Sequence, residues 1–493
     1  MFRFKVDNAG FQSFIFHGRP AFLYLSYDLE GVVKMDLNYM NVLNSLDSFI
    51  WGPPLLVLLV GTGILLTIRL KLLQVFKLPK ALKLIFKAQN AGSGDIDSFK
   101  ALCTALSATV GTGNIVGVAT AIAAGGPGAI FWMWLAAFFG MATKYAEGLL
   151  AVKYREVDAK GEIAGGPMFY IKNGMGEKYK WLGTLFAIFG VLVAYFGIGT
   201  FAQVNSIVDI TKMTIGLDPM WTAVILTVLV AAITLGGLQS IAAAASKIVP
   251  AMAVIYFIST IGVLIFFADK IPGAVETIIS NAFTGSAAAG GFLGSTMIMA
   301  MRNGIARGVF SNEAGLGSIP MVAATAASSS DSPKEAAVRQ ALISMTGPFW
   351  DTVVLCAITG IAAVGSMVSH PQEYRGVAPE NMCFVAFREL PVGGEWMLSI
   401  SLTLFAFATI IGWNVYGTCA VRYLWGEEGV RVYQVAYMFF AYLGAVLSME
   451  LVWGISDLLN SLMALPNLFC LWMLRGEIAT DCGKGTDKTS KKK

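Results

Sequence analysis

Long apolar stretches recur along this chain of 493 residues and leave it few ways to fold. A stretch of about 20 apolar residues crosses a lipid bilayer as one helix. Only 13% of the residues are charged, about half the share in a soluble domain. The sequence predicts an all-α polytopic membrane protein with about eleven transmembrane helices, at 50–70, 100–123, 128–151, 182–210, 220–238, 247–268, 292–326, 338–364, 396–424, 430–449 and 453–474.

The two ends of the chain differ from this apolar body. Residues 1–39 have neither a helical period nor the apolar segment of a signal peptide. Met40 opens a stretch typical of a natural start, with Met35 as the alternative, so residues 1–39 form a doubtful N-terminal extension. We expect a membrane transporter domain over 40–475, followed by a polar, basic cytoplasmic tail over 476–493.

The basic residues indicate how the chain is oriented in the membrane. The segment 69–87 holds six basic residues and no acidic one, and the connection 153–180 holds another six. Short loops rich in Lys and Arg stay in the cytoplasm, so we expect the N-terminus outside and the C-terminus inside. Lysines at near-helical spacing in 77–87 predict an amphipathic helix on the cytoplasmic face. This distribution, with a net charge of only +4, reflects topology and argues against nucleic-acid binding.

Two of the predicted helices are interrupted at mid-membrane. The first breaks in TVGTGNIVG, residues 109–117, and the other is unusually polar at 310–318. Unpaired backbone is costly in lipid, so such breaks are tolerated where they line a cavity. The breaks lie five helices apart. This spacing predicts two inverted halves of five helices, about 100–268 and 292–474, preceded by one extra helix, with the site at the breaks.

The residue types at the first break suit both an anion and a cation. An unwound segment frees N–H groups that favour a carboxylate, and C=O groups that favour a small hard cation. Thr109, Thr112 and Asn114 add side-chain oxygens. The alternative is a plain packing notch at Gly113 and Gly117. The second polar break favours a binding site.

Charged residues inside the predicted helices are functional candidates, because charge is expensive there. Glu313 and Asp351 are either proton carriers or members of structural ion pairs, for example Glu313 with a nearby arginine. Lys144 and Glu147 lie near the cytoplasmic end of their helix, where we expect them to snorkel toward water. The loop at 164–176 is either a structural element or a gate.

Four stretches of the sequence resemble one transporter family. ALSATVGTGNIVGVATAIAAGGPGAIFWMW, GGPMFYI, RGVFSNEAGLGS and LFAFATIIGW are similar to those of the alanine or glycine:cation symporters, and the similarity extends from about Met40 to Arg475. The resemblance implies a leucine-transporter-type (LeuT) fold with one extra helix. It also implies a prokaryotic cytoplasmic (inner) membrane, and uptake of alanine or glycine with Na⁺, or occasionally with H⁺.

The same resemblance implies roles for individual residues. The substrate contacts would be Thr112, Gly113, Asn114, Gln203, Phe310 and Trp413. One cation site would use the carbonyls near Ser107 and Val110 with the Thr409 hydroxyl, and a second would lie near the Thr109 carbonyl and the Asn114 side chain. The chain has Ala408 where the family often has Ser, which removes one hydroxyl beside the first of these sites.

Together these features predict a Na⁺-coupled importer of small neutral amino acids that works by alternating access. An H⁺-coupled symporter and a transporter-like nutrient sensor are the alternatives. The chain lacks the HExxH and GxSxG patterns and any nucleotide-binding loop, so we do not expect an enzyme. We expect no cofactor, no metal except Na⁺ as the coupling ion, and no obligate protein partner.

Overall fold

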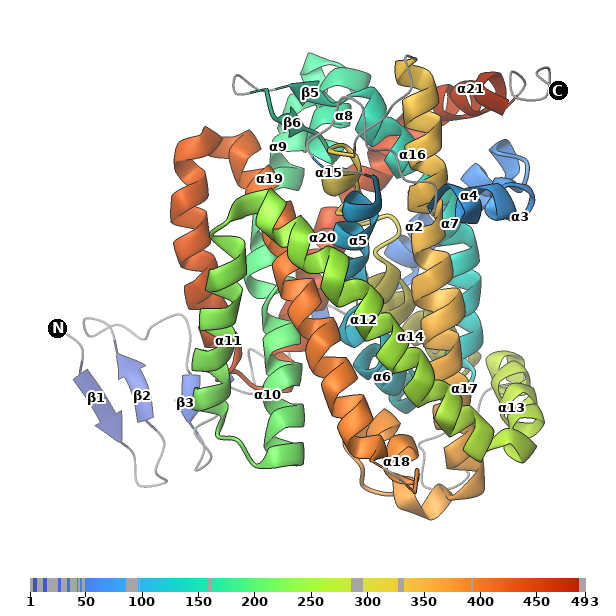
Figure 1. Cartoon of the computed structure of the whole chain (residues 1–493), viewed down its shortest axis with the longest axis vertical. Coiled ribbons are helices and arrows are strands. Elements are labelled where there is room, and N and C mark those ends of the chain that lie inside the picture. Colours follow the sequence, from blue (N-terminus) through green and yellow to red (C-terminus); the bar gives the residue numbers. More distant parts are fainter. Residues whose placement is uncertain are drawn as a thin grey trace.

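A computed structural model describes residues 51–85, 98–157, 161–284, 296–326, 332–391 and 393–486, with short pieces before Trp51 and the single residue Ile96. The described chain is almost entirely helical, as Figure 1 shows. Six helical stretches there are long and apolar enough to cross a membrane: Ala129–Lys153, Glu177–Ile215, Gly237–Phe266, Pro333–Ser369, Gly394–Gly444 and Met449–Met473. Shorter apolar helices cover Pro53–Arg69, Val116–Gly125 and Pro219–Thr234. The expected all-α membrane class is confirmed, while the count of eleven stays a prediction.

The first half of the chain contains the first predicted break. Its helices are α2 (Pro53–Arg69), α3 (Leu73–Phe76), α4 (Leu78–Ile85), α5 (Ser98–Thr109), the 3₁₀ turn η1 (Thr112–Asn114), α6 (Val116–Gly125), α7 (Ala129–Lys153), α8 (Pro167–Met175), η2 (Glu177–Tyr179), α9 (Lys180–Phe196), α10 (Phe201–Ile215), α11 (Pro219–Thr234) and α12 (Gly237–Phe266). The span expected at 182–210 lies within the single apolar stretch Glu177–Ile215, but its helix is interrupted at Gly197 between α9 and α10.

The second half contains the second predicted break, between α14 and α15. Its helices are η3 (Ala268–Lys270), α13 (Ile271–Thr284), α14 (Met297–Asn312), α15 (Pro320–Ala323), α16 (Pro333–Pro348), the π-helical stretch η4 (Phe349–Cys356), α17 (Ala357–Ser369), η5 (Pro371–Tyr374), η6 (Pro379–Asn381), α18 (Met382–Arg388), α19 (Gly394–Gly444) and α20 (Met449–Met473). α19 covers two predicted spans, which are divided at Gly426, where φ is 69°.

The remaining elements lie at the edges of the molecule. Among the described residues there are three antiparallel strand pairs: β1 (Arg3–Val6) with β2 (Gln12–Ile15), β3 (Leu25–Tyr27) with β4 (Val33–Met35), and β5 (Glu156–Val157) with β6 (Ile163–Ala164). The predicted tail forms helix α21 (Arg475–Thr486). Most of residues 1–39, the start of the span expected at 292–326 and the last seven residues lie outside the described residues.

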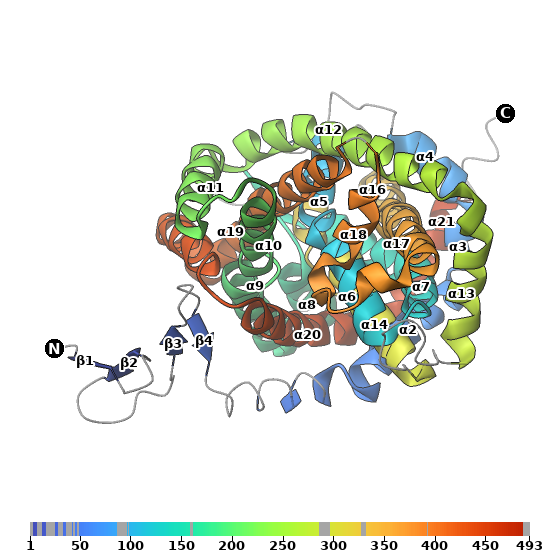
Figure 2. The same ribbon diagram turned by 90° about the horizontal axis from the view of Figure 1, so that it is seen from below.

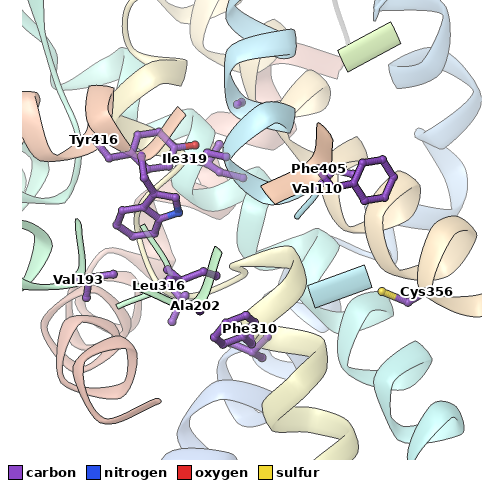
Figure 3. Packing of buried hydrophobic residues seen from close by; sticks show 14 of the residues in the cluster. Val110, Val193, Ala202, Phe310, Leu316, Ile319, Cys356, Phe405 and Tyr416 are labelled. Carbon is purple, nitrogen blue, oxygen red and sulfur yellow. The ribbon is translucent and has the colours of Figure 1, made fainter. Parts of the chain in front are cut away.

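The two interrupted elements sit in the interior of the helical body. α7 packs against α16, α14 and the extra helix α2, while α10 packs against α19. Seen from below, α11, α12 and α13 run along the outside of the elements that carry the breaks (Figure 2). Figure 3 shows buried side chains around the breaks, with Val110 near Phe405, Ile319 near Tyr416 and Leu316 near Ala202. This packing holds the broken segments in fixed positions.

Candidate functional site

The first break is held open by hydrogen bonds that replace those of a helix. α5 ends at Thr109, and Gly111 adopts an extended conformation with φ −142°. The Gly111 N–H donates to the Asn114 side-chain oxygen at 3.0 Å, and the Thr112 N–H donates to the Gln203 side-chain oxygen at 3.2 Å. The backbone of this segment is therefore satisfied by two amide side chains, one local and one from α10.

Neighbouring side chains leave no room for a Cβ atom at position 111, so the first break requires glycine there. A Cβ atom on Gly111 would lie 2.4 Å from Thr409 Oγ1 and 3.2 Å from Gln203 Oε1. Thr409 donates to the Phe405 carbonyl at 3.1 Å and to the Val110 carbonyl at 3.4 Å. The Thr409 hydroxyl thus lies at the carbonyl end of α5, the arrangement that the family resemblance implies for one cation site.

The other residues implied for the cation sites lie on the same helix. The Ser107 hydroxyl donates to the Thr104 carbonyl at 2.8 Å, and the Thr109 hydroxyl donates to the Ala105 carbonyl at 2.8 Å. Both hydroxyls therefore bond back to their own helix, a frequent arrangement for such residues. Each hydroxyl oxygen keeps its lone pairs, so a cation at this helix end could use both the carbonyls and the hydroxyls of these residues.

The two breaks are joined through Asp351. The Asn114 amide nitrogen donates to Asp351 Oδ1 at 2.7 Å, and the Ser311 hydroxyl donates to the same oxygen at 3.1 Å. The Thr352 hydroxyl donates to Asp351 Oδ2 at 2.6 Å. Asp351 is fully buried, and these donors are all neutral. A buried carboxylate surrounded by neutral donors suits a hard cation or a proton as its partner.

The π-helical stretch η4 explains how one amide reaches two of its residues. Asn114 Nδ2 lies 2.7 Å from Asp351 Oδ1 and 3.3 Å from Cys356 Sγ, although these residues are five positions apart. In a π-helix, bonds run from residue i to i+5, so such residues lie nearly one above the other. Cys356 has no sequence signal for a site, because a cysteine in an apolar run usually packs as a small hydrophobic residue.

The second break carries a network that corrects several predictions. Glu313 ends α14 in a left-handed conformation, with φ 55°. Its side chain accepts from Ser318 Oγ at 2.5 Å and from Trp413 Nε1 at 2.8 Å. The predicted pairing of Glu313 with an arginine is wrong. Arg307 instead binds both oxygens of Asp457 on α20, at 3.0 and 2.6 Å.

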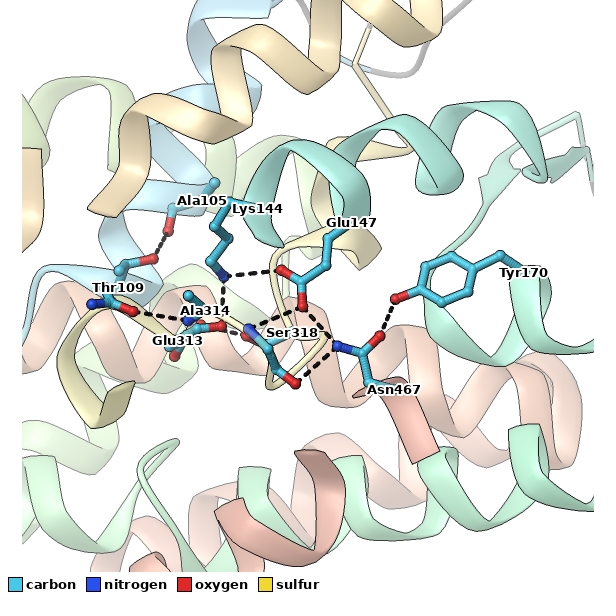
Figure 4. A network of polar contacts seen from close by, with 11 residues as sticks. Ala105, Thr109, Lys144, Glu147, Tyr170, Glu313, Ala314, Ser318 and Asn467 are labelled. Atoms are coloured by element: carbon cyan, nitrogen blue, oxygen red, sulfur yellow. Dashed lines mark hydrogen bonds and ion pairs between the residues drawn. The ribbon is translucent and has the colours of Figure 1, made fainter. Parts of the chain in front are cut away.

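Lys144 and Glu147 do not reach toward water. Both are 0% exposed, so the prediction that they snorkel is wrong. α7 is covered by α14 and α16 at this depth. Figure 4 shows the two side chains turned toward the second break. Lys144 Nζ donates to the Glu313 carbonyl at 2.7 Å and lies 3.6 Å from Glu147 Oε2.

Phe310 and Trp413 lie on different sides of the second break. The Phe310 ring stacks on Trp453 of α20, with centroids 4.6 Å apart, and Arg307 lies over both rings. Trp413 of α19 bonds to Glu313 and packs edge-on against Tyr416. The structure thus brings Thr112, Asn114, Gln203 and Thr409 together at the first break, and Glu313 with Trp413 at the second.

The loop at 164–176 forms β6 and α8, with a structural contact to α20. Tyr170 donates to Asn467 Oδ1, and Asn467 Nδ2 donates to the Gly315 carbonyl at 2.9 Å. Ser311 and Asn467 belong to the site although the sequence predicted neither, because a lone serine or asparagine in a helix gives no signal.

The alternative interpretation of Gly117, as a glycine that lets two helices pack closely, is wrong. A Cβ atom at this position would meet no other atom within 4 Å, so no neighbouring helix requires a glycine there.

Two polar atoms at the first break have no protein partner. Within the described residues, Gln203 Nε2 and Thr112 Oγ1 make no hydrogen bond, and both residues are fully buried. A buried donor or acceptor without a partner is rare and costly. Gln203 Oε1 already accepts a hydrogen bond from the Thr112 N–H. The amide nitrogen of the same side chain, Nε2, is therefore positioned to donate to a ligand at this backbone segment.

Comparisons with known proteins identify the family of this chain. The chain is 47% identical over 452 residues to the sodium/alanine symporter AgcS of Methanococcus maripaludis, covering 90% of this chain and 97% of that protein. It is 50% identical to an uncharacterized transporter of Haemophilus influenzae, over 88% and 93% of the two chains. A probable sodium/glutamine symporter of Bacillus subtilis, GlnT, is 34% identical over 88% of each chain. Because residues 36–493 match the sodium:alanine symporter family model, the chain belongs to that family of membrane transporters.

Proposed function

We propose that this protein carries a small neutral amino acid, alanine or glycine, into the cell together with Na⁺. Membership of the sodium:alanine symporter family supports the coupling ion and alanine. The observation that carries the proposal is the pair of buried, unpartnered polar atoms, Gln203 Nε2 and Thr112 Oγ1, beside an unwound backbone segment. A bound amino-acid zwitterion supplies the hydrogen-bond partners that these two atoms lack.

The substrate carboxylate binds at the first break. The backbone N–H groups of Thr112 and Gly113 lie at the start of the turn that leads into α6, where an anion is favoured. The Thr112 N–H donates to Gln203 Oε1 in this structure, so substrate binding exchanges or shares that hydrogen bond with the carboxylate. Gln203 Nε2 donates a further hydrogen bond to the carboxylate. Phe310 and Trp413 limit the size of the substrate side chain. One methylene group changes the preference of a pocket between two substrates by only about 1–3 kcal/mol. Alanine and glycine are therefore both compatible with this site.

The coupling cations bind on the carbonyl side of the same break. One site uses the carbonyls near Ser107 and Val110 with the Thr409 hydroxyl, which is already 3.4 Å from the Val110 carbonyl. The second uses the Thr109 carbonyl and the Asn114 side chain, next to the buried carboxylate of Asp351. Oxygen ligands of this kind suit a small hard cation.

Transport proceeds by alternating access around these two breaks. Inverted-repeat transporters move one half of the fold against the other around a fixed central site. A ligand shifts such an equilibrium only by its different affinity for the two states. We place the protein in a bacterial or archaeal cytoplasmic membrane, with its N-terminus outside and its C-terminus, including α21, inside.

Proton coupling is the alternative with a specific observation in its favour. The hydrogen bonds to the Asp351 carboxylate come from Asn114, Ser311 and Thr352, which are neutral. A proton on Asp351 would neutralise the buried charge as well as a Na⁺ ion would. Glu313, which binds Ser318 and Trp413, is the other candidate carrier.

Radiolabelled alanine uptake into proteoliposomes tests the proposal. One experiment imposes an inward Na⁺ gradient at equal pH, and the other imposes an inward H⁺ gradient without Na⁺. Uptake that requires Na⁺ supports the proposal. Uptake driven by H⁺ alone keeps the substrate class and assigns coupling to Asp351 or Glu313. A lack of uptake of alanine and glycine by folded protein under both gradients refutes the substrate class.

A further inference from the structure

Two buried carboxylates hold matching positions relative to the two breaks. Glu147 follows Val110, next to the first break, by 37 residues, and Asp351 follows Glu313, at the second, by 38. Each carboxylate contacts the break of the other half. Glu147 Oε1 accepts from the Gly315 N–H at 3.2 Å, while Asp351 accepts from Asn114. The two positions are therefore counterparts in the predicted repeat.

The two carboxylates differ in the charge that faces them. Lys144 Nζ lies 3.6 Å from Glu147 and donates to the Glu313 carbonyl at 2.7 Å (Figure 4). The exposed fractions of the Lys144 and Glu147 side chains are 0% and 1%. In the part of the chain that the structure describes, no lysine or arginine lies within ion-pair distance of Asp351, although Lys144 attracts the Asp351 and Glu313 carboxylates from farther away. One carboxylate has an ammonium group in direct ion-pair contact, and its counterpart has none.

The ammonium group occupies a position with the ligands of a cation site. It contacts the carbonyl of Glu313, the residue that caps the C-terminus of α14, where a helix terminus concentrates negative charge. A carboxylate lies on its other side. Asn467 also donates to Glu147 Oε1 at 2.7 Å, which orients the carboxylate. A carbonyl and a carboxylate at this spacing are the ligands that a monovalent ion would use.

We propose that Lys144 is a fixed internal cation at the second break, in the place that a mobile coupling ion takes at the first. It is a positioning residue, because it neutralises Glu147 and holds the carbonyl end of α14 without contacting substrate. The inference rests on the proposed function, since it presumes that a mobile cation binds beside Asp351. Its consequence is that loss of the lysine charge makes the second break dependent on an added cation.

Thermal unfolding of the purified full-length protein tests this assignment. Unfolding is measured in NaCl and in choline chloride at equal ionic strength, and again at lower pH. We expect Lys144→Met to lose stability in choline chloride and to regain part of it in NaCl, beyond the Na⁺ response of the wild type. Stabilisation at lower pH also supports the proposal, because the recruited cation is then a proton.

Two matched variants separate a counter-ion from simple packing. Lys144→Met/Glu147→Gln removes both charges, so we expect it to show only the wild-type response to Na⁺ and to pH. Lys270→Met makes the same change at an exposed lysine beside Asp269 and should leave both responses unchanged. Alanine uptake by Lys144→Met should show a higher apparent KM for Na⁺, which the double variant returns to the wild-type value.

Several results would overturn the proposal. It fails if Lys144→Met is stabilised by neither Na⁺ nor lower pH more than the wild type, or if the double variant keeps the extra response. If Lys144→Met yields no folded protein, the double variant decides alone: its folding supports the proposal, and its failure to fold refutes it. A wild type that shows no cation-dependent uptake would refute the proposed function, whereas the unfolding comparison would still decide the role of Lys144.

Discussion

Gly113 and Ser311 bring the two breaks into direct contact. A Cβ atom on Gly113 would lie 2.8 Å from Ser311 Cα and 3.0 Å from Ser311 Oγ. Such distances are shorter than packed carbon atoms tolerate. The backbone of η1 therefore lies against the end of α14 without an intervening side chain, and residues about 200 positions apart share one wall of the site.

Gly113→Ala should strongly reduce alanine uptake. The added methyl group pushes η1 away from Ser311, and overpacking of this kind costs about 1–3 kcal/mol. Uptake is measured in proteoliposomes with protein shown to be folded. Gly117→Ala is the matched control, because its Cβ would meet no atom within 4 Å. Equal activity in both variants would mean that the two breaks separate during transport.

Asn114→Ala should abolish uptake while leaving folded protein in the membrane. Asn114 binds the Gly111 N–H and donates to Asp351, and loss of a hydrogen bond to a buried charged group costs about 1.5–3 kcal/mol. That cost corresponds to a loss of at least about tenfold in affinity. Asn303→Ala is the control, because that amide bonds back to Met299 of its own helix. Near-normal transport by Asn114→Ala would remove this residue from the site.

Phe310→Ala should relax the size limit of the pocket toward larger neutral amino acids. The same change removes the stacking on Trp453, and a buried Phe→Ala substitution costs about 3–5 kcal/mol of stability. Uptake of valine and leucine is therefore compared with that of alanine, in protein of verified fold. If the selectivity stays unchanged while stability falls, Phe310 supports Trp453 and does not line the pocket.

The attachment of α21 should depend on salt and on pH. Asp481 pairs with Lys153 at the end of α7, at 2.5 Å, and with Lys334 at the start of α16, at 3.0 Å. Partial burial alone would raise the pKa of the Asp481 carboxyl, but hydrogen bonds from Lys153 and Lys334 together lower it below its usual value. The stabilisation is therefore present above the ordinary pKa of about 4 and is lost as the pH falls through the lowered value.

Hydrogen exchange of α21, compared at neutral pH and below the lowered pKa of Asp481 and corrected for the intrinsic exchange rate at each pH, measures this attachment. Asp481→Asn should expose the helix, and about 1 M salt should have a similar effect on the wild type, because charges at the surface are then screened. Exposed pairs of this kind contribute about 0–1 kcal/mol each, so the change is modest. Protection of α21 that is insensitive to both treatments would assign its docking to apolar contacts instead.

The sequence identifies the breaks but not their partners. The segment around Gly111 and Gly113 stands out because weak helix formers at mid-membrane contradict the apolar pattern on either side. The partners of Lys144 and Glu313 could not be predicted in this way. They depend on how α7 rotates against α14, and helical spacing reports only which residues share a face of one helix. Arg307 illustrates the point, since its partner Asp457 lies 150 residues away.

The same limit applies to helix boundaries. Apolar length alone joins α9 to α10, whereas the helix is interrupted at Gly197 between them. The sequence does predict the division of α19, because the apolar stretches 396–424 and 430–449 lie on either side of Gly426. Hydropathy measures affinity for lipid, and it does not record where a backbone bends inside the protein. Local glycines mark such bends only when their neighbours are known, as Gly111 beside Thr409 shows.

The π-helical stretch Phe349–Cys356 makes this part of the chain sensitive to its length. A turn with i to i+5 bonds contains one residue more than an α-helical turn. Deletion of one residue there would restore regular winding and rotate all of α17 relative to α16. Asp351 and Cys356 would then no longer face Asn114 together. At this position, a deletion of any single residue would be more damaging than most substitutions, because it changes the phase of the whole helix.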